Sequence, residues 1–205
     1  KHHRLMPWNP IPFQTTLPGW MMSQASNTSL TYSYKPLAKQ IGLNYHLAAT
    51  AVQTPYGAPV VKKGKSRTIQ LGFEASFKLA EEWQTANISP TDYTVKQWNS
   101  EMPNAVWIPA AKAVVKYWTG ATMSTAPPPP GGGVGTTNKV LVPGLTVPLN
   151  SAIGSAFKLG KTYPLCSALN VAFIAHLKLV TGSWVGLAAA GTPPPPFVFP
   201  WVTLI

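Results

Sequence analysis

Carboxylate side chains are scarce in this 205-residue sequence, and all five of them lie between Glu74 and Glu101. Residues 1–73 and 102–205 contain neither Asp nor Glu. Carboxylates are the usual general acids and bases, and they are the usual ligands of hard metal ions. Their absence from most of the chain argues against an enzyme, so we expect no catalytic residue, no cofactor and no metal site.

Charged residues of either sign make up 10% of the chain, against roughly 25% in a typical soluble domain. The hydrophobic content of 45% is enough for a core, so the deficit falls on the surface. A surface this poor in charge is typical of a subunit covered by neighbours. The net charge of +11 reflects missing acids, and only Arg4 and Arg67 are arginines. A weak, salt-sensitive attraction to polyanions would follow, but two arginines are few for a reader of bases.

Cysteine and long apolar runs are also rare. Cys166 is the single cysteine, which excludes an intrachain disulfide and a cysteine-based zinc site. Its apolar neighbours predict a place in the core. The most apolar stretch, residues 165–190, is interrupted by Asn170, His176 and Lys178, which predicts a buried helix rather than a membrane span.

The remaining pattern predicts an α+β fold that is rich in helix, with proline-rich extended arms and a few short strands. We expect an extended N-terminal region with short strands at 1–66, a helical region at 67–126 and a Pro/Gly linker at 127–138. Residues 139–205 are expected to form a second helical region with an extended tail.

Apolar residues at helical spacing and helix start signals predict five helices. The second of them opens with Ser89-Pro90, and the third ends at Gly120. The expected helices cover 68–86, 89–99, 108–118, 150–159 and 165–180. Alternating apolar residues predict strands or extended chain at 29–34, 48–53, 59–63 and 140–147.

Two proline-rich segments carry many of the aromatic residues. Residues 5–13 hold three prolines, each of which biases the preceding residue toward an extended conformation. This composition is typical of an arm laid across a neighbouring subunit, and packing on its own domain is the alternative. A run of four prolines at 193–196 precedes a second aromatic segment that ends at Trp201.

Two short motifs bear on phosphate binding. The basic loop of Lys62, Lys63, Lys65 and Arg67 could contact a polyanion, or it could be a solvated loop before a helix. Residues 155–162 are close to a phosphate-binding P-loop, but a helical stretch precedes the Gly-Lys-Thr and no carboxylate follows it. We therefore interpret this second motif as a helix end at a glycine.

The chain resembles the small virion structural proteins of tailed bacteriophages. The resemblance lies in the Pro-Trp-Asn-Pro segment at 7–10, the Tyr-Trp-Thr-Gly helix end at 117–120 and the tetraproline before the aromatic terminus at 193–201. It implies a head, neck, tail or baseplate component that docks extended arms on copies of itself or on other virion proteins. No functional residue of a family is carried over by it.

The leading hypothesis is therefore a structural or assembly subunit located in the virion, with no membrane partner. Buried aromatic residues dominate the energetics of most protein interfaces. The residues expected to dock on neighbours are Trp8, Phe13, Trp20, Phe197, Phe199 and Trp201. The alternative is a capsid or packaging protein that contacts nucleic acid through Lys62, Lys63, Lys65 and Arg67.

Overall fold

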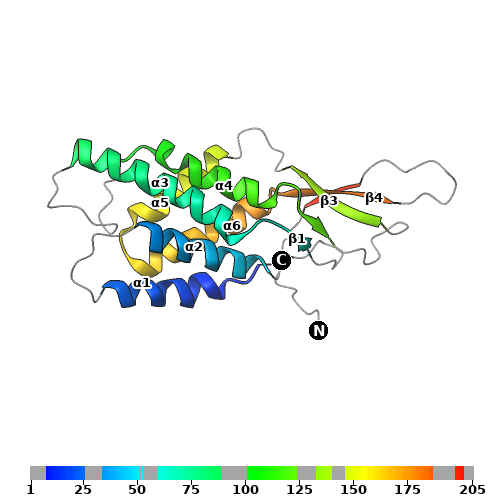
Figure 1. Ribbon diagram of the computed structural model, residues 1–205, viewed down its shortest axis with the longest axis horizontal. Coiled ribbons are helices and arrows are strands. Elements are labelled where there is room, and N and C mark those ends of the chain that lie inside the picture. The colour runs from blue at the N-terminus through cyan, green and yellow to red at the C-terminus, as the bar shows by residue number, and fades with distance from the viewer. Residues whose placement is uncertain are drawn as a thin grey trace.

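The computed structural model describes residues 8–25, 34–50, 52, 60–88, 101–123, 133–139, 146–186 and 197–200. Its body is a bundle of six α-helices (Figure 1). A π-helical turn, η1 (Pro12–Thr16), leads into α1, and a 3-10 turn, η4 (Asn104–Trp107), leads into α4. The α-helices are α1 (Leu17–Ala25), α2 (Tyr34–Ala49), α3 (Ser66–Asn87), α4 (Ile108–Trp118), α5 (Thr146–Lys158) and α6 (Thr162–Leu177).

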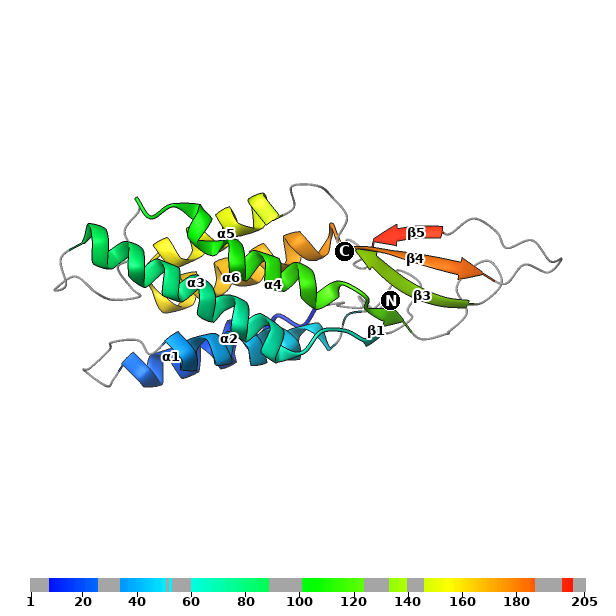
Figure 2. The same cartoon turned by 45° about the horizontal axis from the view of Figure 1, so that its top comes forward.

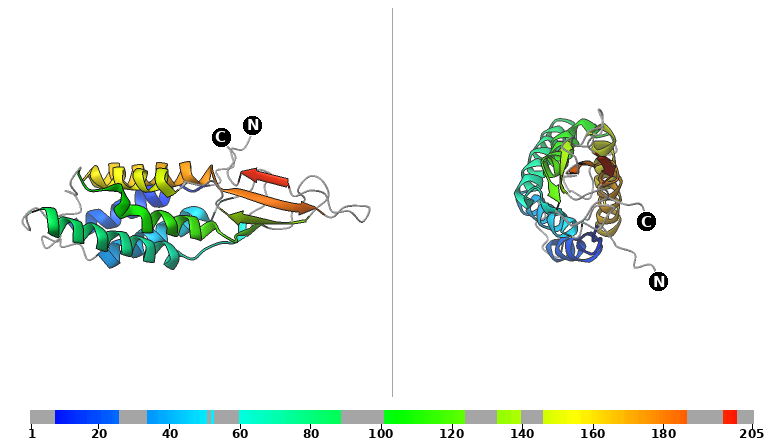
Figure 3. Two further views of the ribbon diagram at one scale, coloured as in Figure 1. Left: turned by 90° about the horizontal axis from the view of Figure 1, so that it is seen from above. Right: turned by 90° about the vertical axis from the view of Figure 1, so that its right-hand side faces the viewer.

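The helices form a closed ring around one core. From α2 to α6, each helix packs against the next one in the chain. The turn η1 contacts both α6 and α2, and α1 contacts α6, so the N-terminal segment closes the ring. Viewed along the long axis, the helices surround a common centre (Figure 3).

Aromatic side chains fill this centre. Trp107 and Phe157 lie parallel, with ring centroids 4.5 Å apart and planes 8° apart. Tyr45 meets Phe173 edge-on at 4.9 Å, an arrangement that aromatic pairs favour. The fully buried aromatic residues come from η1, from η4 and from α2 to α6, so one core joins both halves of the chain. They are Phe13, Tyr45, Phe73, Phe77, Trp107, Tyr117, Trp118, Phe157 and Phe173.

The prediction of an α+β fold with short strands is wrong, because the body and its core are helical. The short extended segments lie beyond one end of the bundle, where they pair as antiparallel neighbours in the order β1-β2-β3-β4-β5 (Figure 2). They are β1 (Val60–Lys62), β2 (Thr122–Met123), β3 (Gly133–Lys139), β4 (Thr181–Gly186) and β5 (Phe197–Pro200). Among the strand residues whose side chains are described, Val60 belongs to the core. The strands therefore form no layer of the body.

The extended N-terminal arm is also a wrong prediction, since residues 12–25 are helical. Pro12 opens η1, where a missing backbone N–H costs nothing because the first N–H groups of a helix have no partner within it. Prolines occupy the second or third position of five of the α-helices: Pro18, Pro36, Pro109, Pro148 and Pro164. In the part of the chain that the structure describes, these prolines therefore begin helices and do not extend an arm.

Several predicted helices are confirmed. The helix expected at 68–86 is α3, and the helix at 108–118 is α4, followed by Gly120 at φ 77°. The helices at 150–159 and 165–180 are present as α5 and α6, although both begin earlier. The strand expected at 48–53 is wrong at its start, because Ala48 and Ala49 end α2. The helix expected at 89–99 lies outside the described residues. The extended segments expected at 29–34 and 140–147 also lie outside them, except at their ends, where Tyr34 begins α2 and Thr146 begins α5.

The helices start without the usual side-chain caps. At η1, α3, η4, α4 and α6 the residue that precedes the first helical turn makes no side-chain hydrogen bond to it. No described helix has an acidic residue in its first turn. Packing of their inner faces must therefore stabilise these helices.

Candidate functional site

The described residues offer little for acid–base or metal chemistry. They contain no group of three or more His, Cys, Asp or Glu side chains that could hold a metal ion. Glu81, Glu82 and Glu101 are exposed, and the carboxylate of Glu74 accepts a 2.9 Å hydrogen bond from the Gln70 amide. No helix in the part of the chain that the structure describes is long and apolar enough to cross a bilayer.

Cys166 lies in the core, as predicted, and its thiol donates a hydrogen bond to the sulfur of Met21 at 3.6 Å. Burial raises the pKa of this thiol to about 12, so the thiolate is not formed near neutral pH. The near-P-loop also proves to be a helix junction. Ser155 lies in α5, Gly160 has φ 67° between the two helices, and Thr162 opens α6.

One part of the basic loop serves the fold rather than the surface. Lys63 is half-buried, and its positive charge acts on His46. Partial burial lowers the pKa of His46 first, and the charge of Lys63 lowers it further. The His46 Nδ1 atom lies 2.7 Å from the Tyr117 hydroxyl, and Gly64 N–H donates to the Tyr117 carbonyl at 2.7 Å. The loop is thus attached to α4 through the Gly64 hydrogen bond, and the charge of Lys63 favours the neutral form of His46 on α2.

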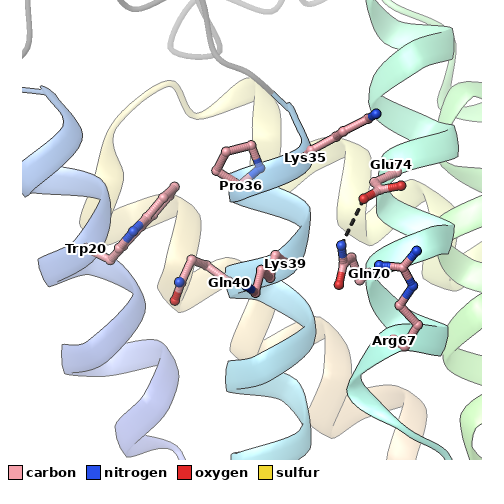
Figure 4. A pocket seen from close by; sticks show the side chains of 8 residues that line it. All are labelled: Trp20, Lys35, Pro36, Lys39, Gln40, Arg67, Gln70 and Glu74. Carbon is pink, nitrogen blue, oxygen red and sulfur yellow. Dashed lines mark hydrogen bonds between the residues drawn. The ribbon is translucent and has the colours of Figure 1, made fainter.

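An open groove lies beside Arg67, on the outer surface of the first three helices. It runs across α2 between α1 and α3 and has a volume of about 650 Å³ (Figure 4). Trp20 enters from α1, while Arg67 and the hydrogen-bonded pair Gln70 and Glu74 come from α3. The four lining residues of α2 are Lys35, Pro36, Lys39 and Gln40.

A second groove begins where the first one ends. It lies between α3 and α4, has a volume of about 430 Å³, and shares Arg67 with the first groove. Lys65 borders it on the α3 side, and Lys112 and Lys116 border it from α4. We call the cations of the two grooves the basic face: Lys35, Lys39, Lys65, Arg67, Lys112 and Lys116.

The charges of the basic face are poorly neutralised. Glu74 is the one carboxylate that lines either groove, and Gln70 already donates a hydrogen bond to it. Within the described residues, the structure records no ion pair between a carboxylate and a cation of the basic face. All six cations are exposed. An anionic ligand could therefore contact them without displacing an internal partner.

A contrasting surface lies on α6. Over its 16 residues this helix has no Asp, Glu, Lys or Arg, although one of its faces is exposed. Val171 is 62% exposed and Tyr163 is 58% exposed. We call this the uncharged face of α6, and its exposed members are Tyr163, Pro164, Ser167, Val171 and Ala175. Leu159 and Leu179 extend it at the two ends of the helix.

The aromatic residues predicted to dock on neighbours are scattered. Trp8 and Phe13 lie in the core, so their assignment as interface residues is wrong. Phe13 lies on η1, which packs against α2 and α6, and Trp8 packs against the rings of Tyr45 and Phe173. Trp20 is half-buried at the first groove. Phe197 and Phe199 belong to β5, where side chains are not described, and Trp201 lies outside the described residues.

Only part of the predicted polyanion loop belongs to the basic face. Lys62 is exposed at the end of β1 and lines neither groove, whereas Lys65 and Arg67 do. Sequence reasoning missed the other four cations: Lys35, Lys39, Lys112 and Lys116. A sequence signal for them was present, because α2 and α4 each carry two of these lysines four residues apart, a spacing that places them on one face of the helix.

Comparison with known proteins adds no relative. No family model matches the chain, and neither the curated proteins nor the solved structures include a match to it. The uncharged face of α6 and the basic face are therefore the two features of the structure that bear on function.

Proposed function

We propose that this protein is a structural subunit of a virus particle, a head, neck, tail or baseplate component that works by packing against neighbouring subunits. The observation that supports this most is the uncharged face of α6. A helix that is apolar on all sides is normally buried on all sides. This one packs inward through residues such as Leu169 and Phe173, yet exposes Val171 and Tyr163 on its outer face.

The neighbour that we propose for this face is a second copy of the chain. A two-fold axis brings one face onto itself, and such isologous contacts are the commonest in soluble oligomers. A surface without charges fits this case, because no like charges are brought together. The scarcity of charge elsewhere in the sequence supports further contacts with other virion proteins.

Self-association of the purified chain tests this proposal. We expect sedimentation analysis to show oligomers whose population rises with protein concentration. Val171→Lys should shift this equilibrium toward the monomer, because the ammonium would lose its water at the contact. Leu79→Lys is the matched control, since Leu79 is also an exposed apolar residue but lies on α3. A wild-type chain that stays monomeric throughout would contradict the proposed contact.

The virion role has its own test. Mass spectrometry of purified particles of the virus that encodes this chain should detect it at a copy number comparable with other structural proteins. Particles that lack the chain would exclude the role, whatever the oligomeric state of the purified protein.

The second candidate function is contact with nucleic acid. The observation that favours it is the gathering of five exposed lysines from α2, α4 and the start of α3 around Arg67. The basic face thus takes the place of the loop of residues 62–67 as the candidate contact surface.

A further inference from the structure

We propose that the basic face binds the phosphate backbone of single-stranded nucleic acid, and that Trp20 stacks on one of its bases. This inference does not depend on the proposed role as a virion subunit. It rests on the continuity of the two grooves, on the balance of charge within them and on the aromatic ring at one end.

Arg67 makes the two grooves one surface. It belongs to the first turn of α3, the middle helix, and lines both the groove toward α2 and the groove toward α4. Packed helices have axes about 8–10 Å apart, so the three helices span roughly 20 Å. Phosphates follow one another at about 3.4 Å along the axis of B-form DNA and are farther apart in an unpaired, extended strand. The face is long enough for several consecutive phosphates.

The balance of charge favours phosphate over other ligands. Six exposed cations face one carboxylate, Glu74, which is held by Gln70. The pairs Lys35 and Lys39, and Lys112 and Lys116, place like charges four residues apart, which weakens an isolated helix. The structure records no compensating ion pair for them among the described residues. A binding role accounts for this arrangement, whereas helix stability does not.

Trp20 indicates an unpaired strand. Its side chain is half-buried at the α1 edge of the first groove, beside Pro36 and Gln40 (Figure 4). Aromatic rings at the edge of a basic groove are typical of single-strand binding, because every base has a flat face that can stack. In a duplex the bases already stack on one another. The ring of Trp20 thus favours single-stranded nucleic acid over a duplex or an acidic protein.

The same residues predict binding with little sequence preference. Five of the six cations are lysines, which attract phosphate as point charges, and Arg67 is the one guanidinium of the basic face. Specific reading of guanine usually requires bidentate contacts from arginine or lysine to a base edge in a duplex groove. We therefore expect oligonucleotides of different sequence to bind with similar affinity.

Fluorescence anisotropy with a labelled thymidine oligonucleotide tests the proposal over a series of salt concentrations. We expect the logarithm of the binding constant to fall linearly with the logarithm of salt, with a slope of about −0.7 for each phosphate contacted. Lys39→Ala, Arg67→Ala and Lys112→Ala should each weaken binding and reduce the slope by about 0.7. Trp20→Leu should weaken binding roughly ten-fold at every salt concentration and leave the slope unchanged.

Matched controls separate the basic face from net charge. Lys78 is exposed on α3 and lines neither groove, and Lys161 and Lys178 flank α6. Lys78→Ala, Lys161→Ala and Lys178→Ala remove the same charge and should leave affinity and slope almost unchanged. Thermal melting of every variant shows whether it is folded. If the controls weaken binding as much as the groove variants do, the basic face is not the site.

Competitors decide the class of ligand. A duplex of the same length should compete less well than the single strand, and polyglutamate should compete poorly. Equal competition by the duplex, with no effect of Trp20→Leu, would overturn the assignment to single strands. Stronger competition by polyglutamate would instead assign the basic face to an acidic protein and overturn the proposal.

Discussion

The indole N–H of Trp8 donates a 2.7 Å hydrogen bond to Oδ1 of Asn170, which joins the first and last parts of the helical ring. Both residues are buried, and 162 positions separate them in the chain. Trp8 also lies edge-on to Tyr45 at 5.2 Å. The start of the chain is thus attached to α6 by a polar contact within an aromatic core.

Asn170→Leu should lower the free energy of unfolding by about 1–3 kcal/mol, because it leaves the buried Trp8 N–H without an acceptor. Urea denaturation of Asn170→Leu, Trp8→Phe and the double variant measures the coupling between the two residues. We expect the double variant to be more stable than the sum of the single effects implies. Strict additivity would show that the hydrogen bond contributes nothing to folding.

Gly72 should tolerate no larger residue, because α3 and α4 cross closely at this position. A Cβ at Gly72 would lie 2.9 Å from the Pro109 carbonyl oxygen and closer still to the Cβ of Ala113. Gly72→Ala should therefore lower the free energy of unfolding by about 1–3 kcal/mol. Gly19→Ala is the control, because a Cβ added at Gly19 of α1 would have no neighbouring atom within 4 Å. The better helix propensity of Ala should make this variant slightly more stable than the wild-type protein. Thermal melting of both variants checks the contrast.

His176 should make the fold sensitive to acid. Its ring is 3% exposed, neither ring nitrogen has a hydrogen-bond partner among the described residues, and burial lowers its pKa to about 4. In the unfolded chain the pKa is near 6.5, so below that pH the unfolded state binds the proton more readily. Stability should thus fall by up to about 3 kcal/mol as the pH falls from 6.5 to 4.

His176→Leu isolates this effect. The ring borders a small apolar cavity of about 80 Å³, lined by residues such as Ala152 and Leu179, that can accept an aliphatic side chain. The variant should lose the part of the pH dependence between 6.5 and 4 that belongs to the imidazole. Denaturation of both proteins at several pH values gives the difference, and parallel pH profiles would contradict the assignment.

Cys166 should be unreactive in the folded protein. Its buried thiol has a raised pKa, and the thiolate is the species that attacks disulfide reagents. A colorimetric thiol assay should show no reaction under native conditions and one equivalent of thiol after denaturation. Rapid modification of the native protein would indicate that α6 and α1 separate at their contact.

The sequence predicted the central helices well because their periodicity is strong. In α3, Ile69, Phe73 and Phe77 follow one another at intervals of four residues, and all three are buried. It failed in the first 50 residues, where prolines were interpreted as signals of extended chain. Pro12 and Pro36 instead occupy the first turns of helices. A proline at the start of a helix and a proline in an arm look alike unless the apolar spacing after it is also considered.

The candidate surfaces were predictable only in part. The basic loop identified Lys65 and Arg67, but the grooves also need α2 and α4 to pack on both sides of α3, which only tertiary structure reveals. The uncharged face of α6 is visible as a helix without charge, yet periodicity cannot tell which of its apolar residues face outward. Val171 and Phe173 are two positions apart and have opposite environments.

Because helices such as α3, α4 and α6 lack side-chain caps, this protein should not fold as separate fragments. Lys65 precedes α3 without a side-chain hydrogen bond to it, and Arg67 adds positive charge where the helix dipole is already positive. A peptide of residues 66–87 should therefore be largely unstructured in water, although the same segment is the longest helix among the described residues. Because the N-terminal segment closes the ring, removing it should unravel the remaining helices together. A deletion variant would then lose binding because it is unfolded, whichever segment was removed. Single substitutions are therefore the way to locate the binding surfaces of this protein.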